Sequence, residues 1–100
     1  MSDIDESNDI LEIEAEKLKR MKQLHVAFIL LDVRTPEIYG AQHIPGALNL
    51  PEAEFEKKII SMVPMKEAPV VIYDADGTRS PELIKKARSL GLINIVMLKG

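Results

Sequence analysis

The 100-residue chain contains no cysteine, no tryptophan and only four aromatic side chains. Without a thiol it can form no disulfide, no thiolate metal site, no redox dithiol and no cysteine nucleophile. Its two histidines, His25 and His43, cannot supply a three-histidine zinc site from one chain, although carboxylates remain available to a hard cation such as Mg²⁺. We therefore predict that the protein uses no resident metal and no cofactor.

Long hydrophobic runs are also missing. The longest uninterrupted apolar run, Val26 to Leu31, is far shorter than the roughly 20 residues that a membrane-spanning helix needs. The first residues, MSDIDESND, are acidic, whereas a secretory signal begins with basic residues and continues with apolar ones. The sequence therefore predicts a cytoplasmic protein that does not act at a membrane.

Charge is unevenly distributed along the chain. Residues 1–16 carry seven acidic and no basic side chains, whereas residues 17–100 carry nine acidic and thirteen basic ones. The body of the protein is thus mildly basic, but its bases are scattered and no aromatic platform accompanies them. We expect no nucleic-acid binding from this pattern.

Length and composition predict one folded unit. A chain of 100 residues has room for a single core, and 46% hydrophobic with 29% charged residues is typical of a globular domain. We expect a flexible acidic tail over residues 1–12 and one domain over residues 13–100. Ile10, Leu11 and Ile13 leave open a short edge strand before the first helix.

Apolar spacing and turn residues predict helices that alternate with strands. Such alternation is typical of an α/β fold, here with a small, mostly parallel sheet of about four to five strands and helices on both faces. Ligands of such sheets bind beyond the carboxyl ends of the strands, which here points to residues 74–80. The expected elements are a helix over 15–23, a strand over 27–33, a short helical turn from Thr35-Pro36 to Gly40, a strand over 47–50, a helix over 51–63, a strand over 70–73, a helix capped by Ser80 and followed by Gly91, and a strand over 94–98.

Three segments resemble rhodanese-like domains. The segment Leu30–Pro51, with Asp-Val-Arg at 32–34 and His-Ile-Pro-Gly-Ala at 43–47, is similar to the leading signature of that family. Residues 69–80 stand where the family has its active-site loop, and residues 94–100 resemble its last strand. The resemblance covers the chain from about Ile13 and implies a small α/β domain with a sheet of about five strands.

The main departure from the family is Asp74. The resemblance implies that an active member begins this six-residue loop with a cysteine that carries a persulfide, held by backbone N–H groups and the start of the next helix. A glycine-containing turn and a helix N-terminus form an anion nest, a curve of backbone that directs N–H groups at a negative charge. We hypothesise that the Asp74 carboxylate occupies its own nest. The candidate site is the loop Asp74, Ala75, Asp76, Gly77, Thr78 and Arg79.

Without the cysteine, the resemblance implies a member that is a thiosulfate sulfurtransferase in name only. We predict a non-catalytic module that regulates or binds, with an unknown protein or a small anion as its partner. Val71-Ile-Tyr-Asp74 also resembles the first domain of tandem sulfurtransferases, which implies the structural half of a larger system. Gln42 replaces a usual glycine, and the family's closing helix does not follow the last strand, so the chain is shortened or lacks that layer.

An alternative function remains open for the same loop. Asp74-Ala-Asp-Gly-Thr78 matches the first motif of haloacid-dehalogenase-like phosphohydrolases, where Asp74 would be the nucleophile, Asp76 the general acid and Mg²⁺ the cofactor. Those enzymes need further motifs over a longer sheet, and only 22 residues follow Thr78. A turn between strand and helix also favours aspartate and glycine without any catalytic role.

Four polar residues have structural and functional interpretations. We expect Asp32 and Arg34 to form an ion pair that anchors the loop rather than a catalytic acid and base. His43, in a turn before Ile-Pro-Gly, is expected to be a hydrogen-bonded structural histidine. Arg79 either binds an anionic ligand or neutralises an aspartate of its own loop.

Overall fold

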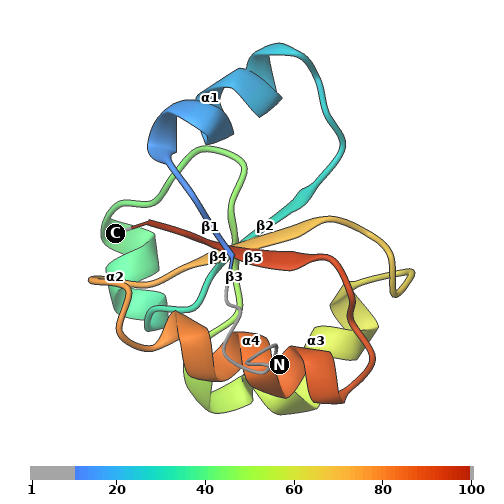
Figure 1. The fold of residues 1–100 in the computed structure, drawn as a ribbon. Helices are drawn as coiled ribbons and strands as arrows, with labels where there is room; N and C mark the ends of the chain where they lie inside the picture. The colour runs from blue at the N-terminus through green and yellow to red at the C-terminus, as the bar shows by residue number, and fades with distance from the viewer. Residues whose placement is uncertain (1–10, 100) are drawn as a thin grey trace.

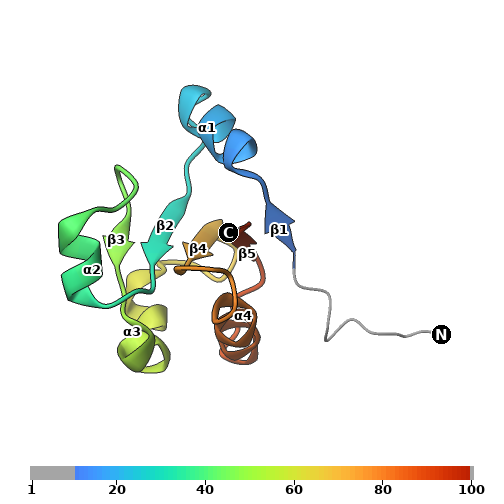
Figure 2. The ribbon, with the colours of Figure 1, turned by 90° about the vertical axis from the view of Figure 1, so that its left-hand side faces the viewer.

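The computed structural model describes residues 11–99, so residues 1–10 of the predicted acidic tail lie outside the described part. Five strands form one sheet in the order β1-β5-β4-β2-β3, and every neighbouring pair is parallel. This confirms the predicted α/β class and its parallel sheet, which Figure 2 shows. The strands are β1 (Glu12–Ile13), β2 (Ile29–Asp32), β3 (Leu48–Asn49), β4 (Val70–Tyr73) and β5 (Ile95–Leu98).

Helices cover both faces of the sheet, as predicted. Helix α1 lies on one face, and α3 and α4 lie together on the opposite face (Figure 1). Helix α2 lies beside β3 at one edge of the sheet (Figure 2). None of the helices within residues 11–99 is long and apolar enough to cross a membrane. The helices are α1 (Ala15–Gln23), α2 (Pro36–Ala41), α3 (Phe55–Met62) and α4 (Ser80–Ser89), with a 3₁₀ turn, η2 (Glu52–Glu54), before α3.

The two faces of the sheet bury unequal cores. Because side chains alternate along a strand, Leu31, Ile72 and Met97 face one side, where they pack in a large cluster with residues of α3 and α4. Their neighbours Leu30 and Val71 face the other side and form a smaller cluster around Leu18 of α1. The larger core therefore fixes α3 and α4, and with them the start of α4 beside the loop at 74–79.

Several elements begin or end at residues other than those predicted from the sequence. The predicted tail includes Glu12, which instead pairs with Met97 in β1. The strand expected over 27–33 is regular only from Ile29, because α1 is followed by a turn in which His25 has a φ of 57°. Helix α2 continues one residue past Gly40. The helix expected from Pro51 begins as the 3₁₀ turn and becomes α-helical at Phe55.

Phe55 offers a test of the larger core. Its side chain is fully buried, whereas Ile60 of the same helix is 47% exposed. We expect Phe55→Ala to lower the free energy of unfolding by about 3–5 kcal/mol, because it leaves a cavity between α3 and the sheet. The matched variant Ile60→Ala should change it by no more than about 0.5 kcal/mol. Urea unfolding followed by circular dichroism measures both, and equal losses would contradict this arrangement of the core.

Candidate functional site

The loop at residues 74–79 curves around its own first side chain. It joins the carboxyl end of β4 to α4. One oxygen of Asp74, Oδ2, accepts hydrogen bonds from the backbone N–H groups of Arg79 at 2.7 Å and Ser80 at 2.9 Å. The other, Oδ1, accepts one from the N–H of Gly77, whose φ of 85° lies in the left-handed region that favours glycine. The Asp74 carboxylate thus occupies the centre of the loop.

The start of α4 corrects one prediction from the sequence. Ser80 was expected to cap this helix, but it is the first helical residue, and Arg79 takes the cap position without a side-chain capping bond. Ser80 is fully buried, and its Oγ has no hydrogen-bond partner among the described residues. The Asp74 carboxylate, on the other side of the loop, instead accepts the N–H groups at the start of α4. It also adds a negative charge at the positive end of the helix dipole.

The second aspartate of the loop, Asp76, accepts hydrogen bonds from other donors than Asp74 does. Oδ1 of Asp76 accepts hydrogen bonds from the hydroxyl of Thr78 at 2.8 Å and from its N–H at 3.1 Å. The hydroxyl bond, followed by the N–H bond, holds the pKa of Asp76 below its usual value. Asp74 and Asp76 are therefore bound separately. Within residues 11–99, no three acidic or histidine side chains come together as a metal site.

Arg79 has a partner that the sequence did not indicate. Its Nε donates to Oε1 of Glu52 at 2.9 Å, and both side chains are largely exposed. The hydrogen bond that Arg79 donates to Glu52 is the main cause that raises the pKa of Arg79. The pair lines a cleft of about 690 Å³ between the loop and α3, which Thr35 and Phe55 also line. Neither aspartate of the loop accepts the guanidinium hydrogen bond.

Beneath the loop, Asp32 and Arg34 form a buried ion pair. Asp32 is fully buried and receives the Nη2 of Arg34 at 2.6 Å, its Nε at 2.9 Å and its backbone N–H at 2.9 Å. The same Nη2 also donates to the backbone oxygen of Gln42 at 2.7 Å. In the sheet Asp32 lies opposite Tyr73, the residue before Asp74. The ion pair therefore holds the point where the loop leaves the sheet.

Opposing influences set the pKa of Asp32. Burial is the largest single influence and opposes ionisation, but hydrogen bonds from the side chain and backbone of Arg34 and from the Tyr73 hydroxyl outweigh it together. The pKa of Asp32 consequently lies below its usual value. Burial, with the nearby Asp32 as a smaller cause, raises the pKa of Tyr73. Asp32 is thus an anion whose charge is fully compensated by its neighbours, which suits an anchor better than a proton donor or acceptor.

Three aromatic residues, Tyr73, His43 and Tyr39, tie the segment before β3 to the site. The Tyr73 hydroxyl accepts the N–H of Ile44 at 3.1 Å, and the Arg34 guanidinium lies 5.5 Å from the centre of the Tyr73 ring. His43 stacks on Tyr39 at 3.8 Å between ring centres, and its Nδ1 lies 2.8 Å from the Tyr39 backbone oxygen. Tyr73 is not among the site residues predicted from the sequence, although an aromatic residue with a hydroxyl at the end of a buried strand is a signal for such a role.

The buried ion pair generates a prediction about acid stability. Because the pKa of folded Asp32 lies below that of an unfolded aspartate, about 3.9, its ionisation stabilises the fold above that pH and is lost as the pH falls further. The stability difference between wild type and Asp32→Asn should therefore shrink on acidification from neutral pH. Urea unfolding as a function of pH measures it, with Glu67→Gln as an exposed control.

Removal of the cation should also cost less stability at low pH, but for a different reason. In Arg34→Met the carboxylate of Asp32 keeps its burial but loses its main donors, so the fold should lose about 3–5 kcal/mol at neutral pH. Burial then raises the pKa of Asp32 above the unfolded value, and protonation on acidification should reduce the loss. Stability curves for Arg34→Met and wild type that run parallel with pH would contradict this account.

Comparison with known proteins identifies the family. The sequence pattern of the family described as "Rhodanese-like domain" matches residues 14–100. The chain is 32% identical to the thiosulfate sulfurtransferase PspE of Escherichia coli over 65 residues, which are 65% of this chain and 62% of PspE. It is 33% identical to the thiosulfate:glutathione sulfurtransferase of Saccharomyces cerevisiae over 97 residues, or 85% of this chain and 70% of that protein.

A solved structure gives the same result. The human single-domain sulfurtransferase TSTD1 superposes with a TM-score of 0.77 at 27% identity, over 89% of this chain and 88% of the human one. The pattern match spans the described strands, helices and loop from the start of α1 onward. The chain therefore belongs to the rhodanese-like domain family.

Proposed function

We propose that this chain is a non-catalytic rhodanese-like module, which regulates or binds a partner or forms the structural half of a sulfurtransferase. The observation that carries the proposal is the Asp74 carboxylate, which accepts three backbone N–H groups at the centre of the loop. In this proposal Asp74 stands where an active relative has its cysteine. The partner is a protein or a small anion, and the site of action is the cytoplasm.

The chemistry of sulfur transfer supports an inactive loop. A thiolate attacks the outer sulfur of a donor such as thiosulfate and retains it as a persulfide, while sulfite leaves. The sequence contains no cysteine, and the carboxylate oxygens of Asp74 offer no such thiolate. PspE and the yeast and human relatives are sulfurtransferases by name, and the chain spans 62% of the length of PspE. Their activity is not carried over to this chain.

The hydrogen bonds of the loop also support a site that excludes outside anions. Buried or partly buried N–H groups need an acceptor, and here one side chain supplies it for Gly77, Arg79 and Ser80. An incoming sulfate or phosphate would find these donors engaged and would meet the negative charge of Asp74. The Asp74 carboxylate therefore fills the nest, and the nest should bind an outside anion only when that carboxylate is removed.

The phosphohydrolase alternative gains no comparable support. In that mechanism Asp74 must direct an oxygen at phosphorus and share Mg²⁺ with other acidic groups. Here both its oxygens accept backbone hydrogen bonds, and Asp76 is bound to Thr78. We keep this alternative only as an outcome of the experiment below.

Asp74→Ala tests the occupied nest. We expect sulfate, phosphate or thiosulfate to leave the melting temperature of the wild type unchanged at constant ionic strength, and to raise that of Asp74→Ala in a saturable way. An anion at 100 times its Kd adds about 2.7 kcal/mol to the folded state, which is a shift of several degrees. Asp76→Ala, in the same loop but outside the nest, is the matched control and should not respond.

Three outcomes would overturn the proposal. Saturable stabilisation of the wild type by these anions would show an open nest, and stabilisation by Mg²⁺ that Asp74→Ala abolishes would favour the phosphohydrolase. Turnover of thiosulfate and cyanide by the pure wild-type protein would show that the loop is catalytic after all.

Asp74→Cys tests the correspondence with the active relatives. If position 74 is the catalytic position of the family, the introduced thiolate should attack the outer sulfur of thiosulfate, form a new S–S bond and release sulfite. Mass spectrometry should then detect one added sulfur atom that a reductant removes. The matched variant Asp76→Cys presents a thiol outside the nest and should gain no sulfur. Equal loading of the two variants would contradict the correspondence.

A further inference from the structure

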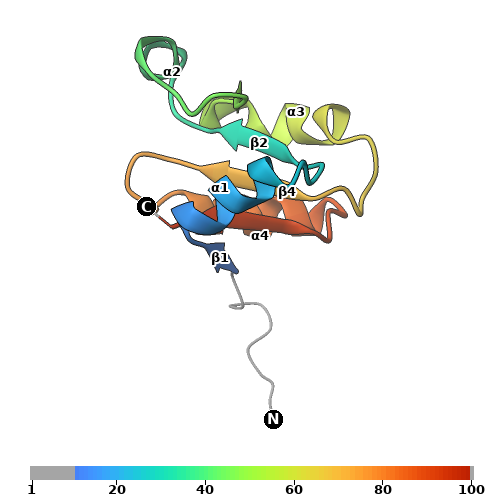
Figure 3. The same cartoon turned by 90° about the horizontal axis from the view of Figure 1, so that it is seen from above.

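The face of the sheet under α1 is covered more thinly than the opposite face. Helix α1 buries one residue, Leu18, whereas α4 buries four. Around α1 the apolar residues of the smaller cluster remain partly accessible, among them Ile13, Val96 and Leu98. Figures 1 and 3 show α1 on that side of the sheet, with α4 on the opposite side. This face therefore retains apolar surface that the described residues do not bury.

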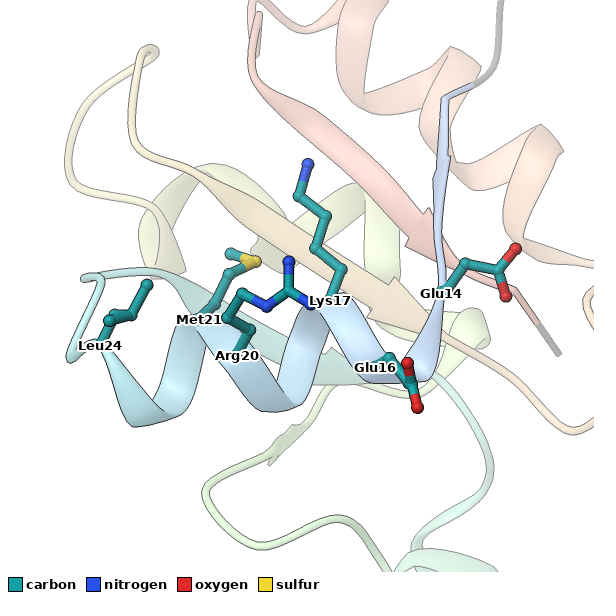
Figure 4. A pocket seen from close by; sticks show the side chains of 6 residues that line it. All are labelled: Glu14, Glu16, Lys17, Arg20, Met21 and Leu24. Atoms are coloured by element: carbon teal, nitrogen blue, oxygen red, sulfur yellow. The ribbon is translucent and has the colours of Figure 1, made fainter.

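A cleft of about 660 Å³ runs along this helix. Figure 4 shows its side chains in a row, with the carboxylates of Glu14 and Glu16 at one end and Leu24 at the other. Lys17 and Arg20 lie one helical turn apart between the two ends, and Met21 lies next to Leu24. The cleft thus presents acidic, basic and apolar chemistry in a fixed order, and its apolar end is open, since Leu24 is 68% exposed.

Three basic side chains of α1 differ from several other basic side chains of the described residues, because they form no ion pair. Arg34, Lys58, Arg79, Lys86 and Lys99 each form an ion pair with a carboxylate. Lys17, Lys19 and Arg20 form none with any residue in the range 11–99. Among the described residues, the charges of Lys17, Lys19 and Arg20 are therefore not compensated by an ion pair.

We propose that this cleft is the docking site for an acidic amphipathic helix of a partner protein. Two carboxylates one turn apart on the partner pair with Lys17 and Arg20, and an apolar side chain beside them packs on Met21 and Leu24. Glu14 and Glu16 repel further acids at the other end, so the order of charges fixes the direction of the bound helix. The docking site rests on the proposed function, to which it adds the chemistry of the partner. Its residues are separate from the loop 74–79.

Charge also bears on two other occupants. In a symmetric dimer through α1, the antiparallel register that sets Lys17 of one copy against Arg20 of the other makes a like-charge contact, whereas a register that sets Glu16 against Arg20 does not, so the dimer is an outcome of the test below. An anionic membrane would be attracted to the bases but repelled by Glu14 and Glu16 beside them. A separate helix can set two acids against Lys17 and Arg20 and an apolar side chain against Met21 and Leu24, with no further acid facing Glu14 and Glu16.

Selection from a phage-displayed library of random helical peptides, with the full wild-type chain as bait, tests the proposal. We expect enriched peptides to carry two acidic residues three or four positions apart beside a leucine, isoleucine or phenylalanine. Binding of a selected peptide should fall about tenfold or more in Lys17→Glu/Arg20→Glu and weaken as salt rises. A peptide with lysines in place of its two acids should recover affinity for that variant.

A matched variant separates this surface from net charge. Lys57→Glu/Lys85→Glu makes the same change of charge with exposed residues of α3 and α4, on the opposite face, and should bind the peptide as wild type does. Asp74→Ala should also bind normally, so failure of the loop proposal and failure of this one are distinguishable. Circular dichroism confirms that each variant is folded.

The docking site is wrong if the selection enriches no pattern of acidic and apolar residues. It is also wrong if the selected peptides still bind Lys17→Glu/Arg20→Glu as they bind the wild type. Binding to vesicles of phosphatidylcholine and phosphatidylserine that depends on Lys17 and Arg20, without peptide binding, would favour a membrane. Self-association that the same two substitutions abolish, measured by analytical ultracentrifugation, would favour a second copy of the chain.

Discussion

A turn that directs several backbone N–H groups at one point must supply an acceptor there, and in this protein the acceptor is the Asp74 carboxylate. It receives N–H groups from Gly77, Arg79 and Ser80, and through the last two it starts α4. The position of α4 in turn decides how Leu83 and the rest of that helix fill the larger core. One side chain therefore couples the loop conformation to the packing of the domain, and its hydrogen bonds engage three N–H groups of the turn.

The two carboxylates at this end of the sheet are neutralised by different means. Asp32 is surrounded by the guanidinium of Arg34 and the hydroxyl of Tyr73, whereas Asp74 is held by backbone dipoles alone. The difference follows from position. Asp32 lies inside the sheet, where the side chain and one backbone N–H of Arg34 reach it, and Asp74 lies at a helix N-terminus, where unpaired N–H groups are plentiful. The guanidinium compensates a buried charge, and the backbone dipoles give the loop its shape.

The sequence allowed prediction of the fold and the location of the loop, because both depend on local patterns. The run Val70–Tyr73 is apolar throughout and is fully buried in β4, and the regular apolar spacing of α4 matches its buried face. The partners within the loop were less accessible. Ser80 was expected to cap its own helix, but the acceptor comes from six residues earlier and depends on the loop conformation. The contact between Arg79 and Glu52, 27 residues apart, joins two exposed side chains that no periodicity relates.

The order of strands has a consequence for how the protein folds. The last strand, β5, lies inside the sheet between β1 and β4, so Glu12 finds its neighbour only in Met97, at the far end of the sequence. Contacts between residues so distant along the chain close large loops and slow the search for the native pairing. On the ribosome, β2 and β4 can pair as soon as both have emerged, but β1 has no strand to pair with until synthesis reaches β5. Of the described strands, β1 is thus made first and is among the last to be placed.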